Sequence, residues 1–165
     1  MEMKDKGVII TRLFGAPREL VWKAWTDPRH LMRWWGPKHY TSPHCTIDLK
    51  VGGKRFWCME APDGTKHWTV GQYREIVPIE RFVYTDQFAD EKGNVVPPSY
   101  YGFPDDWPGE MLVTVTLEAI GGKTRMTVEH LGLPKGKLSS MAAEGWKESF
   151  DKLAETIKPY KEERA

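Results

Sequence analysis

The alternation of apolar and polar positions predicts that most of this chain folds as β-strands. Along 80–88, Phe82, Tyr84, Asp86 and Phe88 share one face, because successive side chains of a strand point to opposite sides. Runs rich in β-branched and aromatic residues extend this pattern along the chain. The other predicted strands are 7–14, 40–50, 55–61, 67–77, 110–120 and 123–133.

Turn signals between these strands predict a mostly antiparallel sheet. Gly52-Gly53, Pro62-Asp63-Gly64 and Gly121-Gly122 each separate two predicted strands. Glycine supplies the positive φ that tight turns need, and connections of this length join neighbouring antiparallel strands.

Apolar residues at spacings of three and four predict one long C-terminal helix over 138–157, which ends before Pro159. Two short helices are predicted after the first strand, over 17–26 and 28–35, because a proline stands at the favoured first position of each. The long helix must bury its apolar stripe, and the concave face of a curved sheet is the available partner. We therefore expect an α+β fold in which about seven antiparallel strands surround the helix and leave space beneath it.

Short motifs follow one another in a distinctive order over residues 8–157. They are Ala16-Pro17-x-x-Leu20-Val21-Trp22-x-Ala24-Trp25-Thr26-Asp27-Pro28, Leu31-x-x-Trp34-Trp35-Gly36-Pro37, Gly52-Gly53, Ala61-Pro62-Asp63-Gly64, Gly71-x-Tyr73-x-Glu75-Ile76-Val77-Pro78-x-Glu80-Arg81-Phe82-Val83-Tyr84-Thr85 and Glu144-Gly145-Trp146. In their order and spacing they resemble the START-like (SRPBCC) superfamily, and within it the Hsp90-ATPase-activator-homologue-type (AHSA1-like) domain. The resemblance implies a helix-grip (START/Bet v1-like) fold with a cavity between sheet and helix.

The resemblance does not imply one chemistry, because members include lipid binders, cyclases and proteins of unknown role. The eukaryotic co-chaperones of this type carry an additional Hsp90-binding domain, for which 165 residues leave no room. We expect a single domain over 1–165 with its core at about 8–157.

Composition narrows the classes of partner. Lysine and arginine total 24 against 23 aspartate and glutamate, and this balance argues against a nucleic-acid binder. The longest apolar runs are strand-sized, far below the roughly 20 residues of a membrane span. The charged start of the chain is followed by no signal-peptide stretch, and two cysteines cannot form a disulfide framework, so we expect a cytoplasmic protein.

Aromatic side chains are the first candidates for a ligand site. The chain has 8 Trp, 6 Tyr and 6 Phe, more than a small core needs, and aromatics line ligand pockets because they offer large apolar area at low entropic cost. The alternative is that they only fill the core. The predicted ligand-binding residues are Trp35, Trp57, Trp68, Tyr73, Tyr84, Asp86, Phe88, Tyr100, Tyr101, Met141, Gly145 and Ser149.

Two features of this set point beyond plain packing. Gly145 lies inside the long helix, where glycine costs about 1 kcal/mol against alanine, so either the sheet or a ligand approaches closely there. The segment 89–109, which carries Tyr100, Tyr101 and Trp107, exceeds the usual length of a loop inside a domain. We expect a lid over the cavity mouth, the alternatives being an inert loop or a homodimer contact.

Acid–base groups and metal ligands are the remaining candidates. Asp86 shares a face with apolar residues, so burial would raise the pKa of its carboxyl, and His67 is a candidate partner in acid–base catalysis. The alternative places Asp86 at an open strand end and His67 in a turn. His39, His44, Cys45 and Cys58 match no common zinc spacing, and no nucleotide or dinucleotide motif occurs, so we expect neither metal nor cofactor.

Three functions are consistent with these features. The first is binding of a small hydrophobic or aromatic molecule, such as a lipid, polyketide or similar metabolite, in the cavity between sheet and helix. The second is an enzyme, a cyclase or hydrolase that uses Asp86 and His67 in the same cavity. The third is a module that binds a chaperone or another protein through exposed aromatic residues.

Overall fold

A computed structural model describes residues 7–103, 109–132 and 137–164, with side chains in the last range described for 139–157. Seven strands form one antiparallel sheet in the order β1-β7-β6-β5-β4-β3-β2. The strands are β1 (Gly7–Phe14), β2 (Thr41–Ile47), β3 (Lys54–Glu60), β4 (Lys66–Val77), β5 (Arg81–Ala89), β6 (Glu110–Ile120) and β7 (Lys123–Leu131). The predicted antiparallel sheet is confirmed; residue 133, the predicted end of the last strand, lies outside the described residues.

Two short helices follow β1, as predicted. They are α1 (Arg18–Thr26) and α2 (Pro28–Leu31). The Asp27 carboxylate caps α2 by accepting a hydrogen bond from the Arg29 backbone N–H at 3.0 Å. The second helix is shorter than the predicted 28–35, because after Leu31 the chain continues through turns at residues 32–34.

The long helix α3 spans Lys137–Arg164. The prediction that it ends before Pro159 is wrong, because the helical backbone continues past this residue. A proline inside a helix forfeits one backbone hydrogen bond and strains the preceding turn, which usually ends or kinks the helix. Here the helix carries on through Pro159 to Arg164, nearly two turns beyond the position where the sequence predicts its end.

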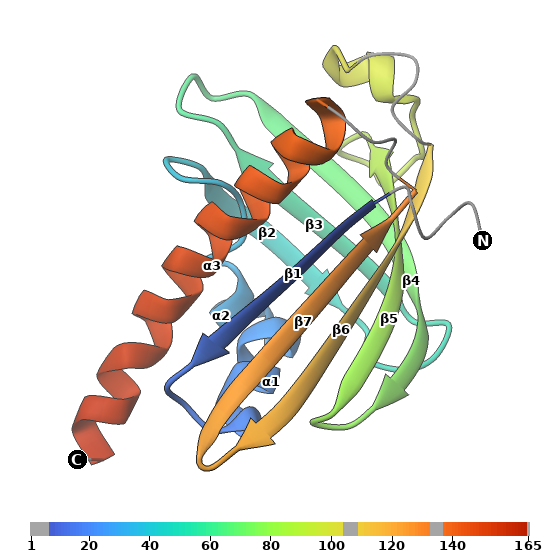
Figure 1. The fold of residues 1–165 in the computed structure, drawn as a ribbon. Helices are drawn as coiled ribbons and strands as arrows, with labels where there is room; N and C mark the ends of the chain where they lie inside the picture. The colour runs from blue at the N-terminus through green and yellow to red at the C-terminus, as the bar shows by residue number, and fades with distance from the viewer. Residues whose placement is uncertain (1–6, 104–108, 133–136, 165) are drawn as a thin grey trace.

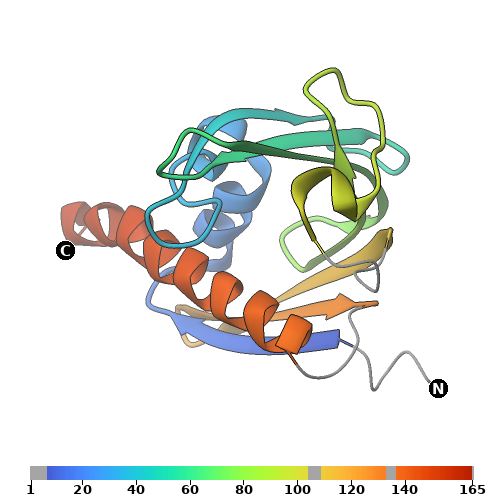
Figure 2. The same ribbon diagram turned by 90° about the horizontal axis from the view of Figure 1, so that it is seen from above.

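The sheet curls around α3 and the two short helices. Figure 1 shows α3, in orange to red, lying across the open side of the curled sheet, and Figure 2 shows the strands wrapping around the interior. The 3-10 helix η2 (Pro98–Tyr101), in yellow, lies at the end where α3 begins. This arrangement confirms the predicted α+β helix-grip fold.

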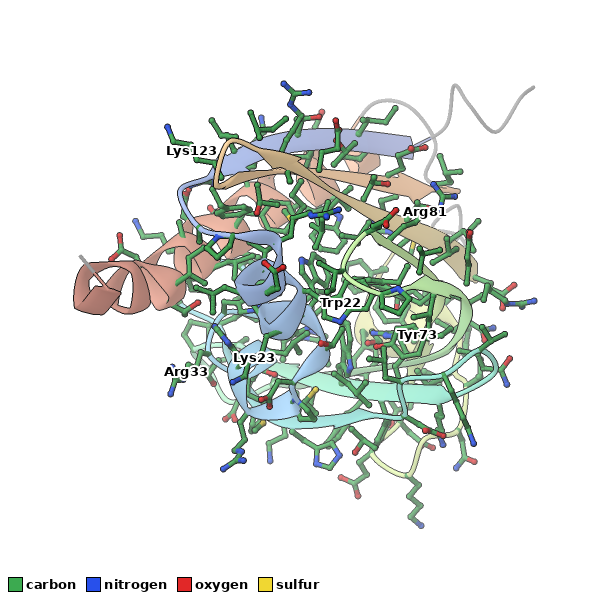
Figure 3. All side chains as sticks on the ribbon, turned by 90° about the horizontal axis from the view of Figure 1, so that it is seen from below. Trp22, Lys23, Arg33, Tyr73, Arg81 and Lys123 are labelled. Atoms are coloured by element: carbon green, nitrogen blue, oxygen red, sulfur yellow. The ribbon has the colours of Figure 1, made fainter. Side chains whose placement is uncertain are left out.

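A tryptophan-rich core closes the end of the sheet near α1. Trp25 is fully buried, and its ring lies 4.8 Å from that of Trp34, 5.5 Å from that of Phe82 and 6.3 Å from that of Phe150. Figure 3 shows this end from below, with Trp22 directed inward and Arg33 at the periphery. The core therefore joins α1, the turn after α2, the sheet and α3 into one packed unit.

Candidate functional site: a cavity beneath the long helix

A cavity of about 310 Å³ lies between the first turns of α3 and the concave face of the sheet. Its walls are mostly apolar, with a few polar side chains among them. The lining residues are Trp35, Gly36, Pro37, Tyr40, Met59, His67, Thr69, Asp86, Gln87, Phe88, Phe103, Met111, His130, Met141, Ala142, Gly145, Trp146 and Ser149. A mostly apolar hollow with few polar groups is typical of a small-molecule site.

The rim of the cavity is fixed by hydrogen bonds between α3 and the loop before β2. Lys152 Nζ donates to the carbonyl oxygens of Pro37 at 3.1 Å and Tyr40 at 3.0 Å. The backbone N–H of Lys38 donates to the Glu148 carboxylate at 3.1 Å. Partial burial lowers the pKa of Lys152. These contacts hold the loop that carries Pro37 and Tyr40 against the helix.

Arg55, which lies behind the cavity wall, is completely buried. Its guanidinium donates to Asp86 Oδ1 at 3.0 Å, to the Thr85 carbonyl oxygen at 3.2 Å and to Thr69 Oγ1 at 3.1 Å. Arg55 thereby forms an ion pair with Asp86, whose side chain is 13% exposed and lines the cavity. A buried charge requires such a partner, because desolvation costs several kcal/mol per ion.

Two aromatic rings sandwich the Arg55 guanidinium. Its central carbon lies 3.9 Å from the ring centroid of Trp57 and 4.5 Å from that of Tyr84, both within cation–π range. Arg55 Nε, Trp57 Nε1 and the Tyr84 hydroxyl are buried without a hydrogen-bond partner among the described residues. Burial raises the pKa of Tyr84 well above its ordinary value, so this phenol stays neutral.

The missing side chain of Gly71 makes room for this arrangement. Gly71 pairs with Arg55 in the ladder between β3 and β4, two residues before an irregularity in the pairing of β4 with β5 that lies between Tyr73 and Glu75. A Cβ atom on Gly71 would lie 1.8 Å from the Thr85 carbonyl oxygen, far inside contact distance. That carbonyl is the one that accepts from Arg55, so glycine is required here for the backbone to approach the ion pair.

His130 forms a second polar group in the wall. Trp146 Nε1 on α3 donates to His130 Nδ1 at 2.9 Å, and His130 Nε2 lies 3.0 Å from Met111 Sδ. Because Nδ1 accepts a hydrogen bond, the neutral ring carries its proton on Nε2. Burial lowers the pKa of His130 to about 4, so the imidazole is neutral near pH 7.

His67, the predicted partner of Asp86, lies elsewhere in the same wall. Its ring packs 5.0 Å from that of Tyr101 and 6.3 Å from that of Tyr40, and partial burial lowers its pKa. Among the described residues, no hydrogen bond joins His67 to Asp86. The structure therefore places both candidates at one cavity without joining them as a pair.

The predicted ligand-binding residues divide into three groups. Those that line the cavity are Trp35, Asp86, Phe88, Met141, Gly145 and Ser149. Trp57, Tyr73 and Tyr84 are buried in the core behind it. Trp68, Tyr100 and Tyr101 instead border a shallow polar hollow outside the sheet, where Trp68 stacks on Phe56 at 4.9 Å.

The described part of the segment 89–109 reaches both regions. The Tyr101 hydroxyl donates to the Ala89 carbonyl and accepts from the Trp68 backbone N–H, which holds η2 on the sheet. Phe103 stacks on Phe88 at 5.0 Å, and both rings line the cavity. Residues 104–108 of this segment, with Trp107, lie outside the described residues.

Sequence reasoning missed several residues of the site, above all Arg55 and His130. Both lie on the inward alternation of their strands: Arg55 is in phase with Trp57 on β3, and His130 is in phase with Val128 on β7. That alternation was the available signal. A polar residue that falls on the inward-facing positions of a strand is a candidate for the cavity wall, in the same way as Asp86 on β5.

The cysteines and histidines near β2 do not form a metal site. No group of three or more His, Cys, Asp or Glu side chains able to hold a metal ion occurs within 7–103, 109–132 and 139–157. Burial raises the pKa of Cys45 to about 12 and that of Cys58 to about 11, so both free thiols stay protonated. Among the described helices, none combines the length and hydrophobicity needed to cross a membrane.

Comparison with known proteins supports the fold in detail. A protein from Chromobacterium violaceum is 29% identical, with 93% of this chain and 98% of that one aligned at a TM-score of 0.75. A protein from Arthrobacter aurescens is 30% identical, with 94% and 88% aligned at a TM-score of 0.75. The AHSA1 protein from Silicibacter pomeroyi, at 24% identity with 92% and 96% aligned and a TM-score of 0.73, shares the fold.

No curated protein matches the sequence. The family model of the "Activator of Hsp90 ATPase homolog 1-like protein" matches residues 15–158, which include β2 to β7, the short helices and the cavity-lining part of α3. The predicted resemblance is thus confirmed, and the chain belongs to the family of Activator of Hsp90 ATPase homolog 1-like proteins.

Proposed function

We propose that the protein binds a small, mostly apolar molecule in the cavity beneath α3. The observation that carries the proposal is a hollow of about 310 Å³ whose apolar walls come from both the sheet and the helix. A cavity of about 150 Å³ can hold benzene, so this one suits a molecule of about two rings. Burial of its apolar surface supplies the affinity, at roughly 25 cal/mol per Å².

Binding is favoured over acid–base catalysis by the state of the candidate groups. Asp86 is engaged by Arg55, and among the described residues it has no hydrogen bond to His67. His130 is held by Trp146 and its pKa lies far below neutrality. A general base must have a pKa near the working pH, which His130 does not supply, and within the described residues His67 has no hydrogen bond to Asp86 that would orient it as a catalytic pair.

The segment through η2 forms part of the proposed site. Phe103 contributes a wall through its stacking on Phe88, and Tyr101 holds η2 to the sheet. We propose that this segment covers the cavity mouth, as expected for a lid. Protease cleavage within 89–109 should slow on saturation with a ligand, and an unchanged cleavage rate would contradict a covering role.

Gly145 offers a direct test of the cavity. A Cβ atom on Gly145 would meet only Pro37 Cγ, at 3.6 Å, so the position opens into free space and tolerates a side chain. Gly145→Leu should fill the cavity and abolish binding of naphthalene, measured by equilibrium dialysis against the wild-type protein. Gly145→Ala is the matched control, because one methyl group leaves most of the volume.

The two variants separate loss of the site from loss of the fold. Circular dichroism and thermal unfolding should show both variants folded, since residue 145 lies inside a helix and leucine and alanine are strong helix formers. Naphthalene binding that survives Gly145→Leu at full strength would rule out this cavity as the site.

A further inference from the structure

The polar groups of the cavity specify more than an apolar ligand. We propose that the cavity selects uncharged aromatic molecules bearing a hydroxyl group, which donates a hydrogen bond to Asp86, and that it rejects carboxylates. This inference rests on the proposed function, since it names the class of ligand that the same cavity accepts.

Asp86 provides one open acceptor. Its Oδ1 accepts from Arg55 Nη1 at 3.0 Å, whereas Oδ2 makes no hydrogen bond with any described residue. The side chain lines the cavity and remains 13% exposed, so water or a ligand can reach it. A carboxylate oxygen accepts hydrogen bonds and donates none, so the matching ligand group is a donor such as a hydroxyl.

Arg55 fixes this acceptor while its own charge stays out of reach. The guanidinium is fully buried, sandwiched by Trp57 and Tyr84, and bonded to Asp86, the Thr85 carbonyl and Thr69. It therefore cannot turn to pair with an anionic ligand. The negative charge of Asp86 neutralises that of Arg55. The ion pair therefore presents a carboxylate oxygen to the cavity as a hydrogen-bond acceptor and no unpaired cation.

The rest of the wall supplies no cation for an anion. Among the described residues that line the cavity, none is lysine or arginine. The two histidines of the wall, His67 and His130, are neutral near pH 7, because burial lowers the pKa of each. A ligand carboxylate would lose its hydration shell and face Asp86, which raises the free energy of the complex.

The flat shape of the ligand follows from the aromatic walls. Trp35 and Trp146 lie 5.5 Å apart at 78°, and Phe88 and Phe103 stack at 5.0 Å and 15°, so rings line the hollow on both the helix side and the sheet side. Aromatic ligands gain offset or edge contacts with such rings in addition to their buried area. A fused two-ring phenol combines this shape with the donor that Asp86 needs.

Four probes of one scaffold test the proposal on the wild-type protein by equilibrium dialysis at pH 7. They are naphthalene, 2-naphthol, 2-methoxynaphthalene and 2-naphthoate. Because a hydrogen bond to a charged group strengthens binding, we expect 2-naphthol to bind at least about 10-fold more tightly than naphthalene and 2-methoxynaphthalene, which cannot donate one. The carboxylate should bind at least about 10-fold more weakly than naphthalene.

A double variant locates the preference at the ion pair. Arg55→Met together with Asp86→Leu replaces the pair by apolar groups of similar size, an exchange that buried ion pairs tolerate. In this variant the ratio of affinities for 2-naphthol and naphthalene should fall to about one. A ratio unchanged from wild type would overturn the assignment to Asp86.

The probes also separate the two proposals. If naphthalene binds but 2-naphthol shows no advantage over 2-methoxynaphthalene, or if 2-naphthoate binds best, the hydroxyl preference is wrong and the apolar site stands. If none of the four probes binds, the proposed function itself fails, and the preference fails with it. The wild-type series gives this answer even if the double variant does not fold.

Discussion

At the residue scale, the ion pair between Arg55 and Asp86 is the contact on which both wall and core depend. The guanidinium touches Trp57 and Tyr84 in the core, and the carboxylate faces the cavity. A buried pair of this kind contributes little net stability compared with apolar residues, but removing one partner strands the other charge. The role of the ion pair is therefore to hold the side chains of Arg55 and Asp86 in one fixed arrangement.

We expect Asp86→Ala to lower the free energy of unfolding by about 3–5 kcal/mol, because it leaves Arg55 buried without a counter-charge. Urea denaturation measures the loss. The exposed pair of Arg81 and Glu75, 3.1 Å apart, is the matched control, and Glu75→Ala should cost less than about 1 kcal/mol. Equal losses in the two variants would contradict the stranded charge.

His130 makes stability depend on pH. Its folded pKa of about 4 lies below the ordinary value of 6.5, so the unfolded chain binds the proton more readily as the pH falls. Above pH 6.5, His130 contributes about 3 kcal/mol to the free energy of unfolding. This contribution is lost as the pH falls from about 6.5 to 4. Urea denaturation at pH 7.5 and 4.5 should show a smaller difference for His130→Gln than for wild type.

The residue scale is also where sequence reasoning was weakest. The strand period placed Asp86 on the same face as Phe82, Tyr84 and Phe88, as the structure has it. Arg55 follows the same rule, but a charged side chain is ordinarily exposed, so the alternation alone does not predict its burial. The Thr85 carbonyl that accepts from Arg55 lies against Gly71, and spacing along the chain does not reveal such an approach.

At the scale of elements, α3 both closes the sheet and shapes the cavity. Trp146, Ser149 and Phe150 are buried on its inner face, while Gly145 opens a gap in the same face. The amphipathic stripe correctly predicted the buried face from Trp146 to Ile157, whereas Met141, also on the predicted stripe, is 49% exposed. The stripe could not predict the helical continuation past Pro159, because a proline inside a helix ordinarily ends or kinks it.

Gly145→Ala should raise the free energy of unfolding by up to about 1 kcal/mol, since alanine is the better helix former and its Cβ meets Pro37 Cγ at an ordinary 3.6 Å. Thermal unfolding without ligand measures the gain. A comparable loss would mean that the sheet or the loop before β2 presses on this position more closely than the structure shows.

At the scale of the whole molecule, Trp25 links the parts of the fold. Its ring contacts Trp34 after α2, Phe82 on β5 and Trp146 on α3, and its Nε1 donates to Met126 Sδ on β7 at 3.3 Å. The sequence predicted the strands, the hairpins and the terminal helix, and the resemblance supplied the helix-grip arrangement. Which aromatic residues fill the core and which face the cavity became clear only in three dimensions.

Trp25→Ala should lower the free energy of unfolding by about 3–5 kcal/mol, as expected for removal of a buried tryptophan. Tyr100→Ala is the control, because Tyr100 is 59% exposed and its loss should change stability by less than about 1 kcal/mol. Urea denaturation compares the two. A loss of less than 1 kcal/mol for Trp25→Ala would show that contacts other than those of Trp25 hold the short helices, the sheet and α3 together.

The pairing of β1 with β7 has a consequence for how the chain reaches this fold. Gly7 pairs with Leu131, so β1 has no neighbour in the sheet until β7 has been synthesised. The hairpins from β2 to β6 join segments close in sequence and can form earlier during synthesis. Because pairing of segments far apart in the sequence slows folding, we expect the closure of β1 on β7 to be a late and slow step.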